Sequence, residues 1–195
     1  MRQGRLIYLM GASGAGKDSV IDASREGLAK RQIVVVRRII TRSAEASGEQ
    51  ALGVSRETFE QMVGEGAFAL HWSANGLRYG IPAEIDQALA QGQWVLINGS
   101  RGYLPEALGL YPNLMPVMVK VATEVLRARL AARGRETEAE INARLARNDQ
   151  LNHMPGNWQG QASALYVVDN STTLAAASEA LLELIDHQRL NVTVG

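Results

Sequence analysis

The sequence predicts a three-layer α/β fold, in which helices cover both faces of a mostly parallel β-sheet. Short runs of consecutive apolar residues recur along the chain, and strands of that kind are buried on both faces, as in parallel sheets. Helical segments separate the runs, and parallel strands need such crossover connections. The first run ends in a glycine-rich stretch that leads directly into a helix. Ligands in sheets of this type bind at the carboxyl ends of the strands.

Five apolar runs are expected to form the sheet, and they span residues 6–10, 33–36, 94–97, 117–121 and 165–168. The second run is Ile-Val-Val-Val, and β-branched side chains favour extended backbone. Helices are expected over residues 17–30, from Ser55 onward, and over 82–91, 123–132, 137–151 and 172–189. Residues 41–54 are polar and contain glycine, with no clear period.

Composition excludes several classes of protein. The 195 residues include 20 basic and 20 acidic side chains, so a net charge of zero gives no general attraction to nucleic acid or membranes. The chain has no cysteine, which excludes disulfides, thiolate metal sites and thiol nucleophiles. No apolar stretch approaches the roughly 18 residues of a membrane span, and the first run is too short for a secretory leader. We therefore expect one cytoplasmic domain without nucleic-acid or membrane partners.

Residues 11–19, GASGAGKDS, nearly match a phosphate-binding loop, in which glycine is followed by four residues, glycine, lysine and serine or threonine. Glycines let backbone N–H groups converge on phosphate oxygens, and the next helix adds positive potential. Lys17 is expected to reach the outer phosphates of a nucleoside triphosphate. The expected nucleotide-binding residues are Gly11, Ala12, Ser13, Gly14, Ala15, Gly16, Lys17, Asp18 and Ser19. The alternative is a plain glycine-rich turn, and the flanking strand and helix favour the phosphate site.

Asp18 stands where the motif has the hydroxyl that contacts Mg²⁺. A carboxylate is a good oxygen ligand for magnesium, either directly or through a bound water. Without the metal, the same charge would repel phosphates. We therefore favour Asp18 as a metal ligand. The alternative is that Asp18 only interacts favourably with the dipole at the N-terminus of the helix.

Three further segments extend the pattern of the loop: ITRSAEASGE at 40–49, FEQMVGEGAFALHWSANGLRYGIP at 59–82 and LINGSRGYL at 96–104. With the loop, they resemble the guanylate-kinase-like P-loop kinases, and within them the ribose 1,5-bisphosphate phosphokinases of bacterial phosphonate breakdown. The resemblance covers nearly the whole chain. It implies a P-loop kinase three-layer fold with a five-stranded parallel sheet, an inserted acceptor-binding lobe and an arginine-bearing lid. The single domain 1–195 would divide into a core (1–40, 92–132 and 152–195), a lobe (about 41–91) and a lid (about 133–151).

The resemblance also implies the residues that bind the acceptor. Thr41 and Arg42 match the guanylate kinase segment that holds the acceptor's phosphate, and arginine suits phosphate because it donates two parallel N–H bonds. Tyr79 matches a tyrosine that touches the same phosphate. Each of these residues, taken alone, could equally be an ordinary surface or rim residue.

The departures from guanylate kinases concern the base of the acceptor. Guanylate kinases read guanine with acidic side chains in two segments, which here are residues 68–71 (FALH) and 98–100 (NGS), without a carboxylate. Extra cations stand nearby, at Arg78 and Arg101. We therefore expect an acceptor with two phosphates and no base, bound also by Arg78, Ser100 and Arg101. The alternative is that both arginines are surface cations.

The implied reaction moves the terminal phosphate of ATP, with Mg²⁺, to the 1-phosphate of ribose 1,5-bisphosphate and yields 5-phosphoribosyl 1-diphosphate (PRPP). Lys17 and the lid residues Arg133 and Arg144 would offset charge on the transferred group, with Arg135 less favoured. Asn170 follows the last strand, where the family places adenine contacts. Two alternatives remain open: a guanylate or other nucleoside monophosphate kinase, and a non-catalytic guanylate-kinase-like binding module.

Overall fold

A five-stranded parallel sheet forms the centre of the computed structural model, which describes residues 4–42, 51–134, 136–153 and 165–193. The strand order is β2-β7-β1-β8-β9, and every neighbouring pair is parallel. The strands are β1 (Arg5–Gly11), β2 (Ile33–Val35), β7 (Trp94–Asn98), β8 (Met115–Lys120) and β9 (Tyr166–Asp169). All five strands predicted from apolar runs are therefore confirmed, with shifts of a few residues at their ends.

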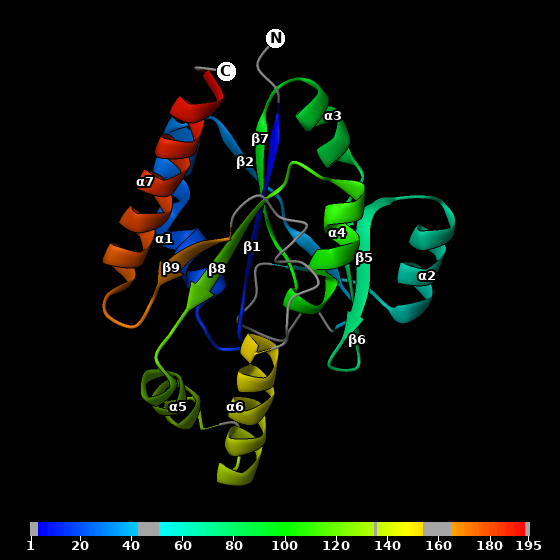
Figure 1. The fold of residues 1–195 in the computed structure, drawn as a ribbon. Helices are drawn as coiled ribbons and strands as arrows, with labels where there is room; N and C mark the ends of the chain where they lie inside the picture. The colour runs from blue at the N-terminus through cyan, green and yellow to red at the C-terminus, as the bar shows by residue number, and fades with distance from the viewer. Residues whose placement is uncertain (1–3, 43–50, 135, 154–164, 194–195) are drawn as a thin grey trace.

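Helices cover both faces of this sheet (Figure 1). On one face lie α1 (Lys17–Lys30) and α7 (Leu174–Thr193), and on the other lie α3 (Glu84–Ala90) and α4 (Leu104–Leu110). Successive side chains of β1 enter opposite cores: Ile7 and Leu9 pack on the side of α1, while Tyr8 and Met10 pack on the side of α4. The strand is apolar from Leu6 to Met10 because both of its faces are buried there.

A second sheet stands beside the first and was not predicted from the sequence. It has four strands in the order β4-β3-β6-β5: β3 (Arg38–Ile40), β4 (Ala51–Gly53), β5 (Phe68–Ala74) and β6 (Leu77–Pro82). The helix α2 (Arg56–Gly64) precedes β5. The strand β4 lies within residues 41–54, where the sequence shows no clear period, because three-residue strands carry too little sequence pattern to show one.

One sequence signal did mark this second sheet. Asn75 and Gly76 form the two-residue connection between the antiparallel strands β5 and β6, with φ of 51° and 77°. Asn-Gly is favoured in such turns because both central residues need positive φ. A short extended segment on each side of Asn-Gly is therefore the one sequence signal for this hairpin.

The helices α5 (Thr123–Ala132) and α6 (Glu138–His153) lie beyond the carboxyl end of β8, away from the other helices (Figure 1). They join the core of the α1 side through Leu126 and Leu130 of α5 and Ile141 and Leu145 of α6. The division into core, lobe and lid at the boundaries given above stays a prediction. None of the helices in the described ranges is long and apolar enough to cross a membrane.

Candidate active site

The glycine-rich loop connects β1 to α1 and has a backbone that only glycine adopts easily. Gly14 and Gly16 have φ of 90° and 83°, in the left-handed region. A Cβ atom on Gly16 would also lie 2.6 Å from Asn170 Nδ2, which is closer than any real contact. The loop therefore requires glycine at position 16 for two independent reasons, its backbone conformation and its close contact with Asn170.

Lys17 begins α1 and folds back over the loop. Its Nζ donates hydrogen bonds of 3.0 Å to the Gly11 carbonyl and 3.1 Å to the Ala12 carbonyl. The ammonium group thus lies against the loop, at the N-terminus of a 14-residue helix. A lysine, a helix N-terminus and a glycine-rich turn together fit a phosphate group.

Asn170 and Arg129 connect this loop to β9 and α5 through hydrogen bonds. Asn170 follows β9, is 2% exposed, and its Nδ2 donates 2.8 Å to the Ala15 carbonyl. Arg129 of α5 donates 2.8 Å to the Asn170 carbonyl, and its Nη1 lies 3.8 Å from the place a Cβ on Gly16 would take. Arg129 was not chosen from the sequence, and the contact of Asn170 with adenine stays a prediction.

Asp18 lies in the first turn of α1 and is half-buried. It accepts a hydrogen bond of 2.7 Å from Asn98 Nδ2 at the end of β7. The sequence analysis named Asn98 only as part of a segment without a carboxylate. Its contact with Asp18 was not predicted, because no local sequence pattern links two positions 80 residues apart. Asn98 Oδ1 is buried and has no hydrogen-bond partner among the residues that the structure describes. It and the carboxylate of Asp18 are hard oxygen ligands, so the residues present fit a magnesium ion.

No group of three His, Cys, Asp or Glu side chains that could hold a metal occurs among the residues that the structure describes. A magnesium ion here would therefore take its other ligands from nucleotide phosphates and water, as magnesium usually does. The role of Asp18 as a metal ligand stays a prediction.

Helix α6 rests on two parts of the site through side chains four residues apart. Arg144 Nη1 donates 3.1 Å to Ser13 Oγ in the glycine-rich loop, and Arg144 Nη2 lies 2.6 Å from Glu136 Oε1. Asn148, which is 9% exposed, accepts 2.7 Å from Arg101 Nη1 in the turn after β7. Residues four apart share one face of a helix, so a single face of α6 contacts both the loop and Arg101.

The other two arginines predicted for the lid are not seen in contact with the glycine-rich loop. Arg133 is exposed at the C-cap of α5, and Arg135 lies outside the described residues. Asn148 was not predicted from the sequence, since an asparagine on a polar helix face gives no signal by itself. The structure therefore brings Arg144, but not Arg133, into contact with the loop.

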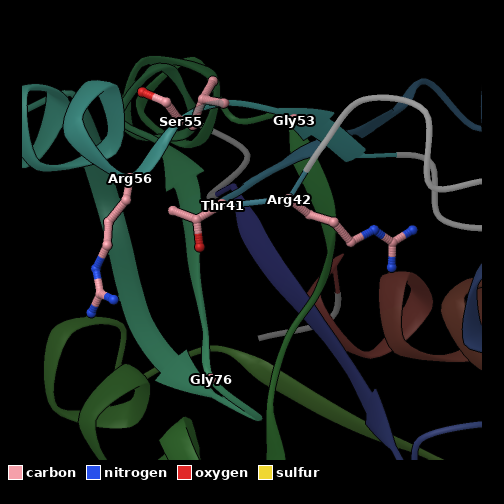
Figure 2. Close-up of a pocket in the computed structure, with 7 residues that line it drawn as sticks. Thr41, Arg42, Gly53, Ser55, Arg56 and Gly76 are labelled. Atoms are coloured by element: carbon pink, nitrogen blue, oxygen red, sulfur yellow. The ribbon is translucent and has the colours of Figure 1, made fainter.

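A cavity of about 520 Å³ lies at the ends of β3 and β4, beside the start of α2, where Thr41 and Arg42 were predicted to bind a phosphate. Thr41, Arg42 and Arg56 come from two separate segments and line it together, with Thr41 between the two arginines (Figure 2). Its remaining lining residues are Gly53, Val54, Ser55 and Gly76. Arg56 was not predicted, because it opens a helix whose face could not be placed from the sequence.

Two residues fix the walls of this cavity. Ser55 is the N-cap of α2 and accepts 3.0 Å from the Thr58 N–H. Thr41 Oγ1 accepts 2.8 Å from the Arg78 N–H, which holds the end of β3 against β6. The cavity therefore combines two cations with the N-terminus of a nine-residue helix, and this arrangement suits an anion.

The structure does not bring Arg78, Tyr79 or Ser100 into this cavity. The Arg78 guanidinium forms an ion pair with Glu60 and lies 5.1 Å from the centre of the Phe59 ring. Their roles in acceptor binding stay predictions.

Tyr79 and Ser100 are engaged elsewhere. Tyr79 is 8% exposed and lies between Trp72, at 5.5 Å ring to ring, and Arg38, at 5.3 Å. The backbone of Ser100 donates to and accepts from the Tyr8 hydroxyl, at 2.9 Å and 2.8 Å. Burial raises the pKa of Tyr8 above its usual value, so the hydroxyl keeps the proton that it donates.

Comparisons with known proteins identify the family of this chain. The guanylate kinase family model matches residues 3–186. The ribose 1,5-bisphosphate phosphokinase PhnN of Azotobacter vinelandii is 57% identical over 182 residues, which are 93% of this chain and 96% of that protein. The protein of the same name from Pseudomonas fluorescens is 55% identical over 184 residues, 94% of this chain and 96% of the relative.

The fold is also that of a solved guanylate kinase. The crystal structure of guanylate kinase from Anaplasma phagocytophilum superimposes with a TM-score of 0.70, covering 97% of this chain and 88% of the other. At 16% sequence identity, that likeness concerns the fold alone. The family model and the full-length relatives decide the classification: this chain belongs to the guanylate kinase family and, within it, to the group of the ribose 1,5-bisphosphate phosphokinases.

Proposed function

We propose that this kinase transfers the terminal phosphate of ATP to the 1-phosphate of ribose 1,5-bisphosphate, giving 5-phosphoribosyl 1-diphosphate and ADP. Relatives that carry the name of this activity match the chain over nearly its whole length. The reaction would serve phosphonate breakdown and PRPP synthesis in the cytoplasm, where ATP is available. The sugar bisphosphate is then the substrate that the acceptor side must recognise.

The observation that carries this proposal is the lack of a carboxylate in the two segments with which guanylate kinases read guanine. In the first of the two segments that guanylate kinases use for guanine, Leu70 is fully buried in the apolar core. In the second, a Cβ atom on Gly99 would lie 2.2 Å from the Tyr8 ring, so no side chain fits there. The N–H donors of guanine would therefore meet no carboxylate in either segment, and a base-free acceptor fits better.

The chemistry asks for positioning and for charge neutralisation. A bond forms between an oxygen of the acceptor's 1-phosphate and the γ-phosphorus of ATP, while the bond from that phosphorus to the bridging oxygen of ADP breaks. The attacking oxygen is already anionic near neutral pH, so no general base has to remove a proton. Lys17 and Arg144, which both contact the glycine-rich loop, would offset the charge on the transferred group. Magnesium, when bound, would supply further neutralisation.

Two places on the acceptor side suit the two phosphates of the sugar. The cavity with Thr41 and Arg42 suits one of them, as the family pattern implies. Arg101 suits the other, and burial lowers the pKa of its guanidinium because desolvation disfavours the charged form. A phosphate beside Arg101 would offset that penalty by charge pairing.

The direct test is product formation. The protein is incubated with ATP, Mg²⁺ and ribose 1,5-bisphosphate, and 5-phosphoribosyl 1-diphosphate is detected by a coupled phosphoribosyltransferase. We expect steady product formation that depends on all three components. Absence of product from a folded, nucleotide-binding protein would refute the proposal, and faster turnover of GMP would show a nucleotide kinase instead.

A change at Ser55 tests whether the cavity receives a phosphate. Asp and Asn cap helices as well as Ser does, so Ser55→Asp and the matched control Ser55→Asn should leave thermal stability within a few tenths of a kcal/mol. Ser55→Asp adds a negative charge to the wall of the cavity, and we expect the KM for the acceptor to rise at least about tenfold. The KM for ATP should not change. Equal acceptor KM values for the two variants would show that no phosphate of the acceptor binds in this cavity.

A further inference from the structure

Asp18 and Asn98 form a polar pair beside the glycine-rich loop. Asn98 is the last residue of β7, and β7 lies directly beside β1, the strand that leads into the loop. The hydrogen bond of 2.7 Å from Asn98 Nδ2 to Asp18 Oδ1 joins residues 80 positions apart. It ties the end of one strand to the first turn of α1 and fixes the carboxylate of Asp18 relative to the sheet.

The second polar atom of the Asn98 amide has no partner in the part of the chain that the structure describes. Asn98 is 4% exposed, and its Oδ1 is buried without a hydrogen bond. Rotating the amide by 180° would not give Oδ1 a partner. It would place Oδ1 against the Asp18 carboxylate, where two hydrogen-bond acceptors would face each other. Buried polar atoms in native proteins almost always have a partner. An unpaired oxygen next to a carboxylate is therefore suited to a cation or to the water that a cation binds.

Compared with P-loop proteins in general, the carboxylate and the neutral oxygen that hold magnesium have changed places in this chain. P-loop NTPases hold the ion with a serine or threonine hydroxyl of the loop and with an aspartate outside the loop. In this chain the loop carries the carboxylate, at Asp18, and the strand end carries a neutral oxygen, at Asn98. Both arrangements hold one carboxylate and one neutral oxygen, so the charge offered to the metal is the same.

We propose that Asp18 and Asn98 together form the magnesium site of this kinase, with the carboxylate on the loop and the neutral oxygen on the strand. The proposal rests on the proposed function, since the ion is the one that accompanies ATP. Asn98 acts twice: its Nδ2 orients Asp18, and its Oδ1 accepts from water bound to the ion. A serine at position 18 would leave the site without a carboxylate, and this explains the departure from the loop motif.

The test measures binding of Mn²⁺, by electron paramagnetic resonance, to protein saturated with a non-hydrolysable ATP analogue. Asp18→Asn keeps the shape of the side chain and removes its charge, so Mn²⁺ binding should weaken at least about tenfold. Asp18→Ser should weaken it similarly, although this variant restores the usual loop motif. The double variant Asp18→Ser with Asn98→Asp has the usual arrangement and should bind Mn²⁺ within about threefold of the unchanged protein, because residues in contact are not additive.

Asp22→Asn is the matched control, since Asp22 lies on the same helix and pairs with Arg25 at the surface. It should bind Mn²⁺ as the unchanged protein does. Unweakened binding by Asp18→Asn, or a folded double variant no better than Asp18→Ser, would overturn the proposal. If the double variant does not fold, as thermal unfolding in EDTA would show, Asp18→Asn decides alone. Failure of the unchanged protein to bind the analogue at all would instead refute the proposed function.

Discussion

Replacing Lys17 by alanine should lower kcat by about 10²–10³-fold, the loss typical of removing one group that stabilises charge in the transition state. In the structure the ammonium group donates to the carbonyl oxygens of Gly11 and Ala12, within the loop. Phosphate oxygens are anionic and are stronger acceptors than carbonyls, so a bound nucleotide would draw the ammonium group toward itself. Initial rates at saturating ATP, acceptor and Mg²⁺ measure the loss.

Lys30→Ala is the matched control for this change. Lys30 ends the same helix, is exposed, and pairs with Glu26 one turn earlier, at 2.7 Å. Its removal should leave turnover unchanged, because the side chain is far along the helix from the loop. Thermal unfolding would show that both variants are folded. A folded Lys17→Ala protein with nearly full turnover would contradict the kinase mechanism.

The central sheet could be predicted from the sequence because both of its faces are buried. From Leu6 to Met10 in β1 and from Trp94 to Ile97 in β7, each side chain enters one of two apolar cores, so each run is uninterrupted and easy to see. The second sheet could not be found in the same way. Its strands β3 and β4 have three residues each, and a period of two needs a longer strand to show.

In the candidate site, too, the features formed by consecutive residues could be predicted, and the contacts between distant residues could not. The glycine-rich loop is contiguous in sequence, and the structure confirms its place between a strand and a helix. The pairs Asp18–Asn98, Arg101–Asn148 and Arg129–Asn170 span 80, 47 and 41 positions. Each is made by the packing of the whole chain, and no local pattern in the sequence encodes such a contact. For the same reason the ion pair of Arg78 with Glu60 could not be anticipated.

The choice of acceptor is the second large effect. We expect kcat/KM for GMP to be about 10⁴-fold lower than for ribose 1,5-bisphosphate, the scale on which polar groups left unpaired in a binding site discriminate between substrates. Leu70 is fully buried, and the Tyr8 ring occupies the space beside Gly99. The N–H donors of guanine would lose their hydrogen bonds to water without gaining a carboxylate in return. Coupled assays of ADP release with each acceptor, at one ATP and Mg²⁺ concentration, measure the ratio.

Arg101→Ala should reduce the ratio of kcat/KM for ribose 1,5-bisphosphate to kcat/KM for GMP, because it lowers only the first of these two values. The variant removes a half-buried cation that the second phosphate of the sugar would need, so kcat/KM for ribose 1,5-bisphosphate should fall at least about tenfold. GMP has a single phosphate, and its already low rate should change little. Arg127→Ala, at an exposed position of α5, is the matched control and should alter neither rate. If Arg101→Ala lowers both rates by the same factor, Arg101 acts on the shared donor side, through its bond to Asn148 of α6, and the second phosphate of the acceptor lies elsewhere.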